Sequence, residues 1–485
     1  MFVRKIKSRN STCFQIGRKE KDRFILIKHV GCAKTEVEIE ALRIKAREEL
    51  TKIVLENQLP LFPDTGSKPK AKLLNWHITG FHQVFGGVYD LIGFPNNLLR
   101  DLSIARIVYP RSKTATIRYL DRYMGIALSK DRVYRFLDQL SKEELTGIAF
   151  RFVYQRQKGI SLIFYDVTTL YFETETEDDL RKKGYSKDHR IDTPQILIGL
   201  FVDSDGYPFD FDVFSGNSFE GHTFQKAIDS LIKRYEFESL TVVADAGMLS
   251  EDNLTFLAKK GISYIVGARI RNLPQNLTQI IKAHDFSKDH LLQIPLDRDR
   301  LIVDFSLERQ KKDFSNRERF LRKLREKLAS GQQLIKKSKY LMVEKGGKVL
   351  GLDQERIDAD KLFDGLKGYI SNTKDLNADV IIKHYHNLWR VEKAFRMSKN
   401  DLKERPVYHQ NREKIQAHLL ICFVSLLVMK ETERMLKEKN YSLEKAIEIL
   451  GKVGQGEMRI GKIQMAIDSE LDQEAQSILE LFVGH

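Results

Sequence analysis

The pattern of apolar and polar positions changes along the chain and divides it into regions. Within residues 1–58, two short apolar runs at 2–7 and 23–30 predict strands, and a patterned, charged segment at about 35–57 predicts a helix. Residues 59–72 hold three prolines and a glycine, which neither a helix nor a central strand tolerates. We therefore predict an N-terminal strand-and-helix module followed by a linker at 59–72.

Residues 73–157 read as mostly helical. Ser112 is placed to cap one short helix, Gly125 to end it, and Ser129 to cap a second helix that carries Arg132 and Arg135. Such a pair can be a helix-turn-helix that enters a DNA groove, or simply two packed helices. The sequence leaves both interpretations open.

From residue 161 onward, short β-branched and aromatic runs alternate with helical patterns. Strands are predicted at 161–169, 195–202, 207–214, 240–244 and 262–270, and helices at about 223–235 and 251–260. Three strands in a meander followed by alternating helices and strands predict an α/β fold, a mixed sheet covered by helices. This core is assigned to residues 158–271 and 376–430.

Between the two parts of this core, residues 272–375 have a different character. Strands are predicted at 301–307 and 339–343, the second followed by a glycine turn at 346–347. A capping box from Ser315 to Glu318 predicts the start of a very basic helix that Gly331 ends. We read this region as a β-rich insertion and residues 431–485 as a C-terminal helical region.

Charge and composition narrow the class of partner. Lys and Arg number 81 against 67 Asp and Glu, a net charge of +14 that favours a polyanionic partner, although a solvated basic surface gives the same total. Residues 419–429 are the most apolar segment and read as a core helix, too short to span a bilayer. The first residues lack an export signal, and the three cysteines are too few for a disulfide framework or a cysteine-based zinc site. We therefore expect the protein to be located in a reducing cytoplasm and to have no membrane partner.

Two aspartates follow strand-like runs and are candidates for metal ligands. Asp166 ends an apolar run, and Asp245 directly follows another, with a glycine just beyond it. Carboxylates brought together at the carboxyl-end rim of a sheet repel one another unless a cation lies between them, and Mg²⁺ prefers oxygen ligands. Either aspartate taken alone would equally fit a cap on the next element.

A third acid is predicted on a long helix at about 378–402. Tyr385, Glu392 and Lys399 are spaced by seven, which places them on one helical face with Glu392 inside an apolar stripe. A carboxylate buried there is costly unless a metal or a cation compensates it. The alternatives are that Glu392 lies at the edge of the stripe and reaches solvent, or that it pairs with Arg396 or Lys399.

Asp166, Asp245 and Glu392, with Tyr385 and Lys399 flanking the glutamate, resemble the Asp-Asp-Glu (DDE) transposases of bacterial insertion sequences. The resemblance covers about residues 160–423 and is to the subgroup with a Tyr-Arg-Glu-Lys signature and a β-rich insertion. It implies an RNase H-like core, two Mg²⁺ or Mn²⁺ ions held by the three acids, and cut-and-paste chemistry on double-stranded DNA at terminal inverted repeats and at a target. It also implies a prokaryotic, nucleoid-associated protein.

The sequence departs from this subgroup at one position of the signature. Leu388 stands where the family has its arginine, so Arg390 or Arg396 would have to contact the DNA phosphate alongside Tyr385 and Lys399. Some relatives trap a flipped base with a tryptophan of the insertion, whereas the tryptophans here are Trp76 and Trp389. A hairpin intermediate is therefore not supported.

Other functions stay open beside the transposase. A plain nuclease shares the chemistry, and a DNA-binding protein without catalysis shares the charge. Residues His384, His386, His409 and His418 are irregularly spaced, and we read them as surface or core histidines rather than a zinc site. Because each transposon end needs an active site, we expect a homodimer on paired ends, joined through residues 430–485, where a helix at about 443–450 carries Ala446, Ile447 and Ile449.

Overall fold

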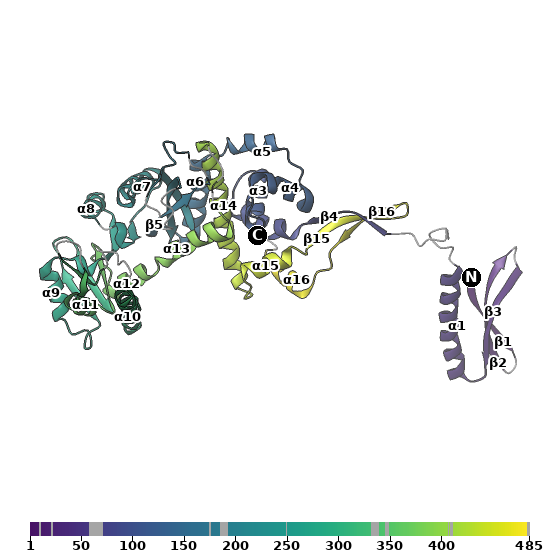
Figure 1. Cartoon of the computed structure of the whole chain (residues 1–485). Coiled ribbons are helices and arrows are strands. Elements are labelled where there is room, and N and C mark those ends of the chain that lie inside the picture. The colour runs from purple at the N-terminus through teal and green to yellow at the C-terminus, as the bar shows by residue number, and fades with distance from the viewer. Residues whose placement is uncertain are drawn as a thin grey trace. The chain divides into compact units, whose positions relative to one another are not determined.

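The computed structural model describes residues 1–8, 11–20, 23–57, 71–173, 176–184, 193–248, 250–330, 339–344, 349–405, 407 and 411–482. These residues form two compact units (Figure 1). One consists of Met1–Trp76 with Gly456–Asp468, and the other of His77–Gln455 with Ser469–His485. The finer division into six regions stays a prediction.

The N-terminal module is an antiparallel three-stranded sheet, β1 (Phe2–Ser8), β2 (Ser11–Glu20) and β3 (Arg23–Ala33), against which α1 (Glu36–Asn57) packs. The outer strands and the helix match the prediction. The central strand β2 was missed, although Thr12, Phe14 and Ile16 alternate as buried residues along it. That alternation is the sequence signal that identifies the strand.

A disulfide joins Cys13 of β2 to Cys32 of β3. The sequence analysis expected no disulfide framework from three cysteines, and this single disulfide was not predicted. The two residues are nineteen positions apart in sequence but lie directly opposite each other in the β2–β3 register. Register is a property of strand pairing, so sequence spacing alone did not reveal it.

A second small sheet joins distant parts of the chain in the order β16–β15–β4. Its strands are β4 (Ala71–Ile78), β15 (Gly454–Ile460) and β16 (Ile463–Asp468). The predicted linker lies outside the described residues apart from 71–72, which begin β4. Residues 73–157 are mostly helical beyond β4, as predicted, whereas the expectation of a helical region at 431–485 is corrected because β15 and β16 belong to it.

The larger unit is built on an eight-stranded mixed sheet in the order β10–β11–β14–β9–β8–β5–β6–β7. Strand β5 is parallel to β8, and β8 to β9, while the other neighbours are antiparallel. The meander β5–β6–β7 followed by parallel β8 and β9 confirms the predicted RNase H-like class. The bounds are β5 (Leu162–Tyr171), β6 (Gln195–Asp203), β7 (Pro208–Ser215), β8 (Thr241–Ala244), β9 (Ser263–Ala268), β10 (Leu291–Pro295), β11 (Arg300–Phe305) and β14 (Leu366–Ser371).

The region predicted as an insertion extends this sheet. Strand β14 pairs antiparallel with β9, and β11 and β10 continue outward from it. The basic helix α10 (Leu307–Ala329) begins eight residues before Ser315, because the Ser306 hydroxyl accepts the Arg309 amide and caps the helix there. Gly331 and the turn at 346–347 lie outside the described residues. A small separate core forms beside α10 with β12 (Leu341–Val343), β13 (Val349–Leu352) and α11 (Gln354–Lys361).

Helix α14 (Arg412–Lys437) lies between the sheet and the helices that precede it, packing against α3, α6 and β7 (Figure 1). Its length and composition would suffice to cross a membrane, but 89% of its most apolar window is buried inside the protein. This agrees with the core helix predicted at 419–429. The short helix α4 (Lys113–Met124) has the predicted N-cap Ser112 and ends at Gly125, and α5 (Lys130–Leu137) has the predicted N-cap Ser129.

The remaining helical elements are α2 (Gly87–Ile92), α3 (Asn97–Val108), α6 (Lys142–Gln157), α7 (Glu220–Arg234), α8 (Glu251–Lys259), α9 (Gln275–Ala283), α12 (Ala378–His386), α13 (Trp389–Arg396), α15 (Leu443–Leu450) and α16 (Gln473–Glu480). Single helical turns lie at His82–Gly86, Ala246–Met248, Ile270–Asn272 and Met397–Asp401. Three of these elements carry predicted site residues: α12 carries Tyr385, α13 carries Glu392, and the turn Met397–Asp401 carries Lys399.

Candidate active site

The two predicted aspartates lie on neighbouring parallel strands. Tyr165 of β5 pairs with Ala244 of β8, so the next residue of each strand is an aspartate at the same level of the sheet. Asp166 lies in the middle of β5 rather than at its carboxyl end, because the strand continues to Tyr171 by pairing with β6. Asp245 does follow the end of β8, as predicted. The parallel register, and not two strand ends, brings the acids together.

Glu392 is carried by a shorter helix than predicted. Residues 378–402 form α12, α13 and the turn Met397–Asp401, and at the junction the Leu388 amide bonds three residues back, to the Tyr385 carbonyl. Glu392 is exposed rather than buried in the apolar stripe. Within the described residues it forms no ion pair with Arg396 or Lys399, so the buried-carboxylate argument and the ion-pair alternative were both wrong, and the edge position is correct.

Tyr385 is hydrogen-bonded to one of the three acids and is influenced by the charges of the other two. Its hydroxyl donates to Asp245 Oδ1 at 3.3 Å from a buried ring. Burial raises the pKa of Tyr385, and the charges of Asp245, Glu392 and Asp166 raise it further. The phenol therefore stays protonated and lies within the electrostatic reach of all three carboxylates. Gly267 makes this possible, since a Cβ there would lie 2.3 Å from the Tyr385 hydroxyl.

Two lysines border the acids. Lys399, in the turn after α13, donates to the hydroxyl of Thr168, which lies two residues beyond Asp166 on the same face of β5. Lys367 of β14 places its ammonium 4.5 Å from the centre of the Tyr385 ring. Burial lowers the pKa of Lys367, and Asp245 is among the charges that oppose this shift. Sequence reasoning missed Lys367, because nothing local indicates that β14 joins the core sheet.

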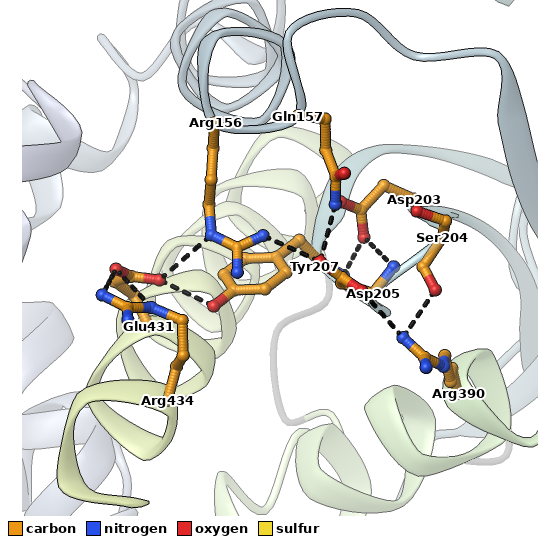
Figure 2. Close-up of polar contacts among 9 residues, drawn as sticks. All are labelled: Arg156, Gln157, Asp203, Ser204, Asp205, Tyr207, Arg390, Glu431 and Arg434. Atoms are coloured by element: carbon orange, nitrogen blue, oxygen red, sulfur yellow. Dashed lines mark hydrogen bonds and ion pairs between the residues drawn. The ribbon is translucent and has the colours of Figure 1, made fainter. Parts of the chain in front are cut away.

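The two arginines proposed in place of the family arginine lie elsewhere. Arg390 Nη1 donates to the Ser204 carbonyl at 2.6 Å and to Asp205 Oδ1 at 3.1 Å, both in the β6–β7 turn (Figure 2). Arg396 is exposed on α13, and Leu388 is buried. The contacts of Arg390 fix α13 to the sheet, and a DNA contact by Arg390 or Arg396 stays a prediction.

The same turn anchors two further helices. Gln157, at the end of α6, donates to Asp203 at 2.8 Å and to Asp205 at 2.7 Å, and the Tyr207 hydroxyl donates to Glu431 of α14 at 2.6 Å (Figure 2). Asp203, Tyr207 and Glu431 are all buried. Helices α6, α13 and α14 thus share one polar anchor. The Arg390 contacts therefore hold α13, which carries Glu392, together with its packing against β5 and β6 and the ion pair of Lys393 with Glu433.

The three carboxylates are a suitable donor set for a hard divalent cation. Asp166 and Asp245 each accept the next residue's amide, at 2.8 and 2.6 Å, which fixes the orientation of both carboxylates. Across the described ranges, no group of three or more His, Cys, Asp or Glu side chains lies close enough to hold a metal ion. The residue types therefore fit the ions, whereas the side-chain arrangement does not by itself outline a site. Of the four histidines considered in the sequence, His409 lies outside the described residues.

The sequence profile of one protein family, described as Transposase DDE domain, matches residues 157–428. No curated protein sequence matches the chain.

Among solved structures, the piggyBac transposase synaptic complex with hairpin DNA aligns over 80% of this chain and 82% of that chain, with 9% identity and a TM-score of 0.40. The Mos1 transposase paired-end complex with left transposon end aligns over 46% and 66%, with 11% identity and a TM-score of 0.16. The Mos1 mariner paired end complex with Mn aligns over 47% and 71%, with 11% identity and a TM-score of 0.16. Likenesses this weak do not establish a common fold.

Proposed function

This chain belongs to the transposase DDE-domain family, and we propose that it cuts DNA at the terminal inverted repeats of a transposon and joins the cut ends to a target. Asp166, Asp245 and Glu392 are the proposed catalytic residues and metal ligands. The observation that carries the proposal is the family match over residues 157–428, within which the parallel strands β5 and β8 put Asp166 and Asp245 at the same level of the sheet. The three acids lie on different elements, namely β5, the residue after β8, and α13.

Each side chain has a chemical task in this proposal. Two divalent ions, Mg²⁺ or Mn²⁺, held by the three acids would supply an activated water or 3′-hydroxyl and stabilise the leaving oxygen. Tyr385 stays protonated because its pKa is raised, so in the DNA complex its single O–H would donate to a phosphate oxygen in place of Asp245. Lys399 supplies a point charge beside Asp166, through its position on Thr168.

Paired DNA ends require an active site for each end, so we propose a homodimer on double-stranded DNA. The suggestion that α15 joins the copies has little support. Ala446 and Ile449 of that helix are buried inside the same chain, which accounts for its apolar face. Light scattering with and without end DNA measures the stoichiometry, and a 1:1 complex that completes strand transfer would refute the dimer.

We expect Mg²⁺-dependent cleavage confined to the boundary of the inverted repeats that flank the gene, followed by joining to a target duplex. The assay incubates the protein with those repeats, with scrambled repeats as the control. Indiscriminate cutting of both substrates favours the plain nuclease, and tight binding without product favours a DNA-binding protein without catalysis. Either result overturns the proposed reaction.

Replacing Lys399 with alanine is expected to weaken binding of end DNA and to reduce the slope of log affinity against log salt by about one unit. The reason is the loss of one cation that contacts a backbone phosphate, while residual cleavage still requires the divalent ion. Fluorescence anisotropy over a salt series measures both quantities. The matched control is Lys439→Ala, since Lys439 is an exposed lysine remote in sequence from the site. An unchanged slope in Lys399→Ala would contradict the phosphate contact.

A further inference from the structure

A basic cavity of about 440 Å³ lies at the N-terminal end of α4. The ionisable groups that line it are all bases, with Tyr134 as the remaining polar ring, and none of the lining residues is Asp or Glu. The bases come from α3, from α4 and the segment before it, from α14, and from the segment after the turn that carries Lys399: Arg106, Arg111, Lys113, Lys403, Arg405 and His418. Four of these side chains, Arg106, Arg111, Lys403 and Arg405, are cations near neutral pH, and such a group around one hollow forms a site for an anion.

Lys113 is the observation that separates this cavity from an ordinary basic surface. Its side chain is buried, with 5% of the residue exposed, and it forms no hydrogen bond or ion pair with any of the described residues. Burial, together with the charge of the neighbouring Arg106, lowers the pKa of Lys113 to about 7. Because charging this side chain is costly here, an anion bound in the cavity would stabilise the ammonium form and be held by it.

The surrounding groups are held ready for such a ligand. Arg106 is fixed by donating to the Leu402 carbonyl at 3.3 Å and by its contact with His418 Nδ1 at 3.5 Å. Glu404, which lies between Lys403 and Arg405 in the sequence, accepts a hydrogen bond from the Ser398 hydroxyl at 2.6 Å and does not line the cavity. Thr114 and Ala115, in the first turn of α4, complete the wall and add the positive end of a twelve-residue helix.

We propose that this cavity binds a phosphate group of the DNA backbone and holds the duplex beside the catalytic acids. The inference rests on the proposed function for the identity of the polyanion, whereas the anion site rests on the cavity itself. Lys403 and Arg405 follow within six residues of Lys399. The segment 399–405 would therefore contact two phosphates of the same duplex, one in the cavity and one at the active site. The exposed Arg132 and Arg135 of α5, the helix that follows α4, lie on the second half of the predicted DNA-reading pair.

The test compares Lys113→Met with wild type in three measurements, and Lys439→Met serves as the control for loss of an exposed lysine. Affinity for end DNA is measured over a salt series, and melting temperature is measured with and without inorganic phosphate at matched ionic strength. We expect Lys113→Met to bind DNA about tenfold more weakly and to lose about one unit of salt slope. We also expect it to melt about 2–4 °C higher than wild type, because a buried unpaired ammonium is removed.

The combination of greater stability with weaker binding is what a ligand site predicts and what a purely structural lysine does not. Phosphate should raise the melting temperature of wild type and of Lys439→Met more than that of Lys113→Met. If wild type binds DNA and Lys113→Met binds it equally with the same salt slope, the DNA inference is overturned. If wild type fails to bind DNA, the proposed function fails, and a phosphate effect that depends on Lys113 then assigns the cavity to a free phosphate compound instead.

Discussion

Replacing Asp166 or Asp245 with asparagine, or Glu392 with glutamine, is expected to reduce Mg²⁺-dependent cleavage by orders of magnitude. Each change keeps the size of the side chain but removes a negative charge that the divalent ions need. Binding of end DNA should persist and tighten slightly, because one anion facing the phosphates is gone. Glu392→Gln should change the free energy of unfolding by no more than about 0.5 kcal/mol, since Glu392 is exposed and has no ion-pair partner among the described residues.

The decisive experiment measures cleavage, DNA affinity and thermal unfolding for each variant in parallel. Glu355→Gln is a matched control, because Glu355 is an exposed glutamate in the first turn of α11 and belongs to no site described above. A Glu392→Gln protein that still cuts DNA at the wild-type rate would exclude Glu392 as a metal ligand. A variant that loses both cleavage and folding would instead assign the residue a structural role.

Replacing Asp364 with alanine is expected to destabilise the region around α10 by about 3–5 kcal/mol. Arg317 donates to Asp364 at 2.5 Å, and their side chains are only 5% and 7% exposed. Removing the acid leaves a buried guanidinium without its charge partner. The small core beside α10 contains Leu321, Leu324, Tyr340, Leu341 and Ile357, so little other apolar burial is available to offset the loss.

Denaturant unfolding and hydrogen exchange of α10 measure this effect. The control is Asp358→Ala, whose ion pair with Lys361 is about half exposed and should contribute less than about 1 kcal/mol. The double variant Arg317→Met, Asp364→Leu should recover most of the loss, because replacing both partners removes the uncompensated charge. If Asp364→Ala is no less stable than Asp358→Ala, the buried pair does not anchor the helix.

The sequence by itself determined the order and type of the core elements. Strands β5 to β9 with helices α7 and α8 were predicted to within a few residues, because each is written in a local alternation of apolar and polar positions. The caps Ser112 and Ser129 were readable for the same reason, since a cap is a local contact. Asp166 and Asp245 were identified from their places after apolar runs, and the spacing to Glu392 linked them to one family.

What only the tertiary structure decided depends on contacts between distant residues. Strand β14 joins the core sheet beside β9 and brings Lys367 close to Tyr385. Cys13 meets Cys32 because β2 and β3 pair in that register. Strand β4 pairs with β15, which lies almost at the other end of the sequence. The predicted long helix is divided into α12 and α13, and Glu392 on α13 is exposed rather than buried in an apolar stripe. The cavity around Lys113 likewise gathers bases from four segments. Local patterns record whether a segment is a helix or a strand, but pairing and burial are chosen by the free energy of the whole fold, so these features had no local signal.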